Sequence, residues 1–157
     1  MKDQTKSNTW FIGFIHFILG GWIISFIIAF LILILFSLFF PQLEYVMSMS
    51  NFDLTKEAAQ IIASILSLWI GVYYSARFIK WRYNITNAKS LVRQTIIIYI
   101  IFQIFGFVYG VYSGKALLGS DMFFQLLVPF VVGSVSFYFF SKKFLIGNFS
   151  QVSTKNL

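Results

Sequence analysis

The chain has 157 residues, of which 59% are apolar and only 11% are charged, with a formal net charge of +7. Soluble domains contain about a quarter charged residues, and a single core cannot bury this much apolar surface. The composition therefore excludes most soluble enzymes and predicts a membrane protein. The absence of cysteine excludes disulfides and thiolate metal sites.

Four long runs without Asp, Glu, Lys or Arg define the expected elements, at residues 10–40, 58–76, 94–114 and 122–141. About 20 apolar residues suffice for a helix to cross a hydrocarbon core near 30 Å, and the runs lack the alternating polarity of a spanning strand. We expect an all-α integral membrane protein, a four-transmembrane-helix bundle forming a single domain over 1–157. The C-terminal tail, 144–157, is expected to be flexible.

The first run is longer than a perpendicular helix needs, so we expect it to tilt and to begin with an interfacial stretch near Trp10. Its His16 is the only His, Lys, Arg, Asp or Glu within the four runs. The position of His16, six residues after Trp10, predicts a place near the cytoplasmic interface. A pH-sensing or proton-relay role is the alternative.

Small residues recur every fourth position in three of the runs. This spacing lets helix backbones approach closely in lipid, where apolar packing gives little association energy. We expect the stripes to pack within one bundle, with one stripe left for a second copy or another subunit as the alternative. The stripes consist of Gly21, Ser25 and Ala29; Ala59, Ala63, Ser67, Gly71 and Ser75; and Gly106, Gly110 and Gly114.

Two further features lie in the third and fourth runs. Gln103 is near the middle of its run, where an unpaired amide is costly, so it should bond a serine or a backbone carbonyl of a partner helix. Pro129 removes a backbone donor inside the fourth run, and Gly133 follows one turn later. Together they mark a kink and a candidate hinge.

The basic residues predict the orientation. Of the twelve Lys and Arg, only Lys56 and Lys115 fall on one side of the expected membrane. The positive-inside rule then places the N-terminus, the loop 77–93 and the C-terminus on the cytoplasmic side of the membrane. The membrane we expect is a plasma membrane, the bacterial inner membrane. The loop also carries aromatic residues, but we interpret this mixture as an interfacial belt and not as a nucleic-acid site. Contacts with anionic lipid are expected from Arg77, Lys80, Arg82, Lys89, Arg93, Lys142 and Lys143.

The runs contain no carboxylate, lysine or arginine, and ion-coupled carriers and intramembrane enzymes generally need such groups. We also expect no Asp pair, no histidine cluster for a metal and no serine meeting a histidine of a second helix. The sequence therefore predicts a non-enzymatic multi-pass protein without a cofactor. It would act by helix packing, as an accessory or assembly subunit of a membrane complex or as a self-associating module. The alternative is a small oligomeric pore or carrier for a neutral or weakly polar solute.

Overall fold

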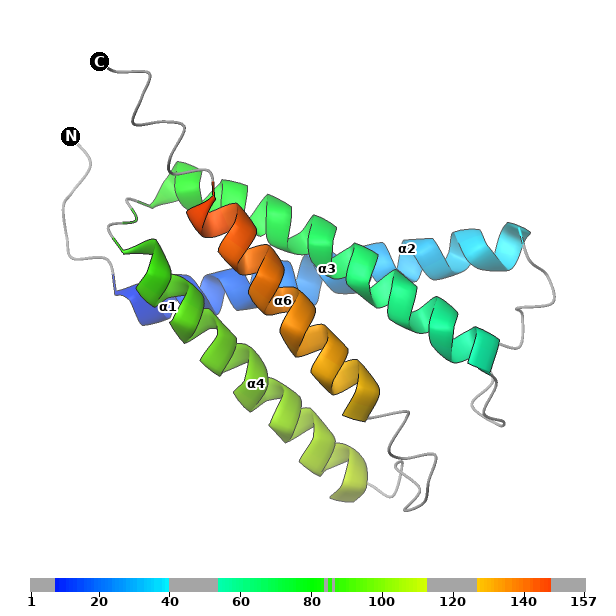
Figure 1. Ribbon diagram of the computed structural model, residues 1–157. Coiled ribbons are helices and arrows are strands. Elements are labelled where there is room, and N and C mark those ends of the chain that lie inside the picture. The colour runs from blue at the N-terminus through cyan, green and yellow to red at the C-terminus, as the bar shows by residue number, and fades with distance from the viewer. Residues whose placement is uncertain (1–7, 40–53, 84, 86, 113–126, 148–157) are drawn as a thin grey trace.

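The computed structural model describes residues 8–39, 54–83, 85, 87–112 and 127–147, and they are almost entirely helical (Figure 1). The first helix is continuous but changes type, because a π-helical stretch, η1, separates α1 from α2. The elements are α1 (Thr9–His16), η1 (Phe17–Ile23), α2 (Ile24–Phe39), α3 (Leu54–Arg82), α4 (Ala88–Tyr112) and α6 (Val128–Ile146). The all-α prediction is confirmed.

Three of the described helices are long and apolar enough to cross a membrane, over Thr9–Phe36, Ala58–Arg82 and Ala88–Tyr112. The fourth, α6, has 19 residues and carries Lys142 and Lys143 near its end. Part of the run predicted for it, 122–126, lies outside the described residues. Three candidate spans indicate a multi-pass membrane protein.

The helices extend beyond the apolar runs. Most of the predicted loop 77–93 is helical, because α3 continues to Arg82 and α4 begins at Ala88, where Asn87 Oδ1 accepts a hydrogen bond of 2.9 Å from Ser90 N–H. The tail predicted as flexible begins too early, since α6 continues to Ile146 and Leu145 is fully buried. Residues 148–157 lie outside the described part of the chain. Charge marks where an apolar run stops, but lysine and arginine are good helix formers and do not end a helix.

The helices form a closed ring at one end of the bundle. The first helix contacts α4 through α1 and contacts α3 through η1 and α2, and α6 packs against both α3 and α4. At the closed end, all four helices contribute to an apolar core made of Ile12, Ala76, Ile79, Leu91, Val92 and Leu145. A second core, further along the helices, is made of Phe17, Leu68, Val72, Ile98, Tyr99 and Phe137.

Beyond this second core the helices diverge, and α2 and α4 point away from each other (Figure 1). Among the residues whose burial is described, Tyr99 is the last buried one along α4 and Ser25 is the last along the first helix. We call the packed part the closed half and the diverging part the open half. The basic residues Arg77 to Arg93 and Lys142 to Lys143 all belong to the closed end of the helices.

Candidate functional site

His16 is fully buried in the closed half, between α1, α3 and α6. Its Nδ1 is 2.8 Å from Ser75 Oγ of α3, and its Nε2 is 3.3 Å from Ser141 Oγ of α6. The Ser75 hydroxyl also donates to the His16 carbonyl oxygen, at 3.3 Å. A neutral ring with its proton on Nδ1 satisfies all three contacts, donating to Ser75 and accepting from Ser141. His16 therefore joins three helices.

This cluster corrects one expectation. The prediction that no serine meets a histidine of another helix is wrong, because Ser75 and Ser141 both do so. His16 is buried inside the bundle, and its place near the cytoplasmic interface stays a prediction. The two serines are 59 and 125 residues away from it along the chain, so only the fold brings them together. Since all three side chains are 0% exposed, the cluster is positioned to hold helices together.

The small residues of the first helix and of α3 make a close helix contact. A Cβ added at Gly20 would lie 2.9 Å from Ser75 Cβ, and one added at Gly71 would lie 2.5 Å from the Gly20 carbonyl oxygen. The Ser25 hydroxyl donates to the carbonyl oxygens of Gly20 and Ser67. Small residues are needed here because the two backbones touch.

The three predicted stripes differ in their surroundings. Five members are buried between helices, and Gly21 packs against Phe137 and Tyr99. A Cβ added at Gly106 or Gly110 of α4 would meet no atom within 4 Å. Gly114 lies outside the described residues. The buried members are Ser25, Ala63, Ser67, Gly71 and Ser75, and the half-buried members are Gly21, Ala29, Ala59 and Gly110.

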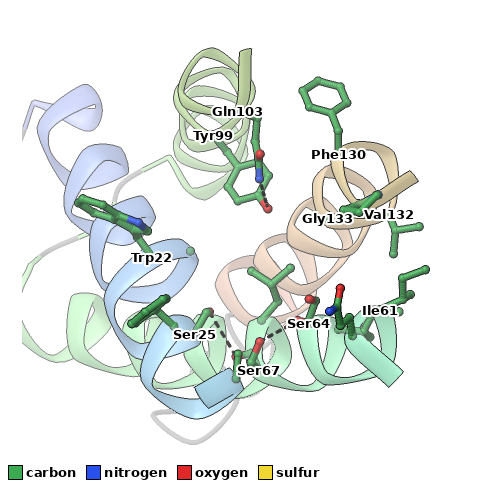
Figure 2. Close-up of a pocket in the computed structure, with 17 residues that line it drawn as sticks. Trp22, Ser25, Ile61, Ser64, Ser67, Tyr99, Gln103, Phe130, Val132 and Gly133 are labelled. Carbon is green, nitrogen blue, oxygen red and sulfur yellow. Dashed lines mark hydrogen bonds between the residues drawn. The ribbon is translucent and has the colours of Figure 1, made fainter. Parts of the chain in front are cut away.

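A cavity of about 460 Å³ lies where the helices begin to diverge, and its lining comes from all four helices. Figure 2 shows side chains of the first helix, α3, α4 and α6 around it. Its polar groups are hydroxyls and amides, and none of the described lining residues is Asp, Glu, Lys, Arg or His. The polar lining consists of Ser25, Gln60, Ser64, Ser67, Tyr99 and Gln103, with an indole from Trp22.

Gln103 contributes its amide to this cavity but bonds within its own helix. Its Nε2 donates to the Tyr99 hydroxyl at 2.9 Å (Figure 2). We expected a bond to a partner helix, and this expectation is wrong, because Tyr99 is four residues earlier on the same helix face. The Tyr99 ring stacks on Phe137 of α6 at 4.4 Å between ring centroids. Tyr99 thus makes a contact with a neighbouring helix, α6.

The two candidate hinge residues also border the cavity. Pro129 is in the first turn of α6, a position that tolerates a missing N–H without a kink. Leu127, just before α6, also has helical backbone angles, so the kink and the hinge at Pro129 stay predictions. Gly133 is buried, and a Cβ there would lie 2.8 Å from the Tyr99 hydroxyl oxygen. Gly133 therefore makes room for the tyrosine.

The π-helical stretch forms one edge of the cavity. At its end, the Ile24 N–H bonds the Leu19 carbonyl oxygen, five residues back. Such a stretch widens the helix and leaves some carbonyls without their usual partner, and the Ser25 hydroxyl bonds one of them, that of Gly20. No sequence signal that we used predicts this stretch, although two adjacent glycines, Gly20 and Gly21, lie inside it.

The predicted anionic-lipid contacts all lie at the closed end. Arg77, Arg82, Lys89, Arg93, Lys142 and Lys143 are exposed there, and Lys80 is half-buried. Trp10 and Trp81 are also exposed, as interfacial aromatic residues would be. The Lys80 ammonium donates to the Phe144 carbonyl oxygen at 2.5 Å, near the end of α6.

Comparison of the chain with protein-family models, with curated proteins and with solved structures finds no match. The fold and the site of the chain define a helical protein with three helices able to span a membrane and with an uncharged cavity between four helices.

Proposed function

We propose that this protein is a non-enzymatic multi-pass membrane protein that binds a small neutral or weakly polar molecule between its helices, as a small pore or carrier does. The carrying observation is the uncharged cavity of about 460 Å³. Its volume is in the range of ligand sites, about 300–1,000 Å³. Apolar walls with a few hydroxyl and amide groups suit a solute with hydrogen-bonding groups and no charge.

The close contact of the first helix with α3 also supports this function over stripe-mediated association. The groove that Gly71 and Ser75 form on α3 is filled by Gly20 and Ser25 of the same chain. A groove that is already filled cannot receive a second subunit. The polar groups around the cavity are better placed to contact a ligand than the stripe on α3 is to contact a second subunit.

Liposome flux tests the proposal. Vesicles containing the protein should pass glycerol or urea faster than protein-free vesicles, as measured by stopped-flow light scattering. Ser64→Phe should reduce this flux toward the protein-free rate, because the new ring fills the cavity. Ile62→Phe is the matched control, since Ile62 is an exposed residue of α3 outside the cavity lining. Equal flux from vesicles with and without protein would contradict transport of these probes.

The second candidate is an accessory or assembly subunit of a membrane complex, or a self-associating module. The outer part of α4 supports it, because a Cβ at Gly106 would meet no atom and the flanking Phe105 and Tyr109 are 70% and 67% exposed. A neighbouring transmembrane helix could pack on this face. Affinity capture in mild detergent should then return a stoichiometric partner or a dimer. Recovery of monomer alone would count against this candidate.

The proposed topology has four crossings of the plasma membrane, with both termini on its cytoplasmic side. The distribution of Lys and Arg supports it. A reporter that is active only outside the cytoplasm should be active when it is fused after Asn51 or Asp121. A reporter that is active only inside the cytoplasm should be active when it is fused after Asn87. The reverse pattern would contradict the orientation. In the proposed orientation, the basic closed end faces anionic headgroups of the cytoplasmic leaflet.

A further inference from the structure

The cavity where the helices begin to diverge lies along the membrane-spanning parts of the helices. Its lining includes Trp22, near the centre of the candidate span Thr9–Phe36, and Gln103, near the centre of Ala88–Tyr112. Ser64 belongs to the third candidate span, on α3. The cavity is therefore level with the acyl chains of the surrounding lipid.

The rim of the cavity on the first helix is made of two aromatic residues. Trp22 and Phe26 both line the cavity, and they are 62% and 69% exposed. They are four residues apart, so they lie on one side of the helix. Beyond this level α2 and α4 point away from each other (Figure 1). Exposed side chains of a membrane-spanning helix contact acyl chains, so these two rings connect the cavity with the lipid.

The polar groups of the cavity lie on two of its walls. On α4, the Gln103 amide donates to the Tyr99 hydroxyl at 2.9 Å, and the Tyr99 ring stacks on Phe137. Figure 2 shows this pair on the opposite side of the cavity from Ser64 and Ser67 of α3. Hydroxyls and amides both donate and accept, so a ligand with two hydroxyl groups can bond both walls. A charged head would be strongly unfavourable at this depth.

We propose that the cavity binds the head of a single-chain lipid with uncharged hydroxyl groups, such as a monoacylglycerol, whose chain passes Trp22 and Phe26 into the bilayer. The hydroxyl groups bond the Gln103 amide and the serines of α3. A volume of about 460 Å³ holds the head and the first acyl carbons, while the rest of the chain stays in the lipid. This inference rests on the proposed binding function of the cavity and names the class of its ligand.

Quenching of tryptophan fluorescence tests the site, because Trp22 is beside the path of the chain. The chain has four tryptophans, so the variant Trp10→Phe, Trp69→Phe, Trp81→Phe retains only Trp22. The quencher is a monoacylglycerol with bromine on its acyl chain, added to the full chain in detergent. The matched reference retains only Trp69, which is 45% exposed within the span of α3 and outside the cavity lining. Trp22 should be half-quenched at a mole fraction of quencher about tenfold lower than Trp69, because a site concentrates the lipid there.

Changes to the cavity and to the ligand should each weaken the quenching of Trp22. Ser64→Phe fills the cavity and Gln103→Leu removes the amide, so each should raise the half-quenching mole fraction at least about fivefold. Ile62→Phe, at an exposed residue of α3 outside the cavity lining, is the control and should change it less than about twofold. A brominated methyl ester with the same chain and no hydroxyl group should require about tenfold more. Circular dichroism should show unchanged helicity in each variant.

The quenching and the glycerol flux together separate this inference from the proposed function. Equal quenching of Trp22 and Trp69, or equal quenching by the methyl ester and the monoacylglycerol, would overturn the lipid as the ligand. If glycerol flux still depended on Ser64 in that case, the cavity would bind a water-soluble solute and the proposed function would stand. If neither quenching nor flux depended on Ser64, both would fail. Quenching of Trp22 that depends on Ser64, without glycerol flux, would support the lipid and contradict transport of glycerol.

Discussion

His16 and Gln103 are polar side chains inside an apolar bundle, and they are satisfied in different ways. His16 uses both ring nitrogens for contacts with two other helices, Ser75 on α3 and Ser141 on α6. Gln103 bonds Tyr99 of its own helix and turns the rest of its amide toward the cavity. The first arrangement suits a structural role, and the second suits contact with a ligand.

Replacement of His16 should therefore weaken the whole fold. We expect His16→Ala to lower the free energy of unfolding in detergent by at least about 2 kcal/mol, because it removes a packed ring and its links to α3 and α6. Thr95→Val is the control, since the buried Thr95 hydroxyl bonds only the Leu91 carbonyl oxygen of its own helix. It should cost less than about 1 kcal/mol. Equal losses would contradict the special role of His16.

Individual residues were predictable where one helix determines their role and unpredictable where several do. The four-residue spacing singled out Ser75 from the sequence, but nothing in it showed that His16 would be the partner. Ser141 was not predicted at all, because a single serine near two lysines gives no periodic signal. Gln103 is an exception, because its partner Tyr99 lies four residues earlier on the same helix and this spacing alone indicates the pair.

At the scale of the elements, the first helix is the one that changes neighbours. Its α1 part packs on α4 and its α2 part on α3, with the π-helical stretch between the two contacts. Gly20 and Gly71 let η1 and α3 cross with touching backbones. A larger residue at this crossing must move one helix, whereas a larger residue at Gly106 meets open space.

Alanine substitutions at two glycines should separate these environments. Gly71→Ala should lower the free energy of unfolding by about 1–3 kcal/mol, because its Cβ would overlap the Gly20 carbonyl oxygen. Gly106→Ala should leave stability unchanged or raise it by up to about 1 kcal/mol through helix propensity. Denaturant titration in one detergent would measure both. Equal effects would show that close approach at Gly71 does not matter.

Helix type and approximate position were predictable from the apolar runs, but the ends were not. Arg77 to Arg82 read as the start of a loop, yet they continue α3, because charged side chains can remain helical once the helix leaves the apolar layer. The sequence also did not predict which helices cross each other. A stripe shows that a helix can be approached closely, but it does not name the helix that approaches.

The whole molecule combines a closed basic half with an open half whose described cavity lining is uncharged. The buried clusters lie in the closed half, and the cavity of about 460 Å³ lies where the helices separate. Ser64 at the cavity is exposed, and Ser75, three turns along the same helix, is 0% exposed. The two halves should therefore differ in their access to small water-soluble reagents.

Cysteine labelling can measure this difference, since the natural chain contains no cysteine. A Ser64→Cys variant should react with a small water-soluble thiosulfonate at least about tenfold faster than a Ser75→Cys variant. The reason is that a reactive thiol must be reached by the reagent and ionise in contact with water. Unfolded protein in denaturant is the control, in which both thiols should react at similar rates. Similar rates in the folded protein would contradict the division into two halves.

The contact of His16 with Ser141 joins residues 125 positions apart, and the core of the closed half includes both Ile12 and Leu145. During synthesis, the first helix must therefore remain in the bilayer without its final neighbours until α6 has been made. Contacts of such long sequence separation form late and slow folding. Any chain interrupted before α6 should hold α1 and α3 without the residues that complete their core.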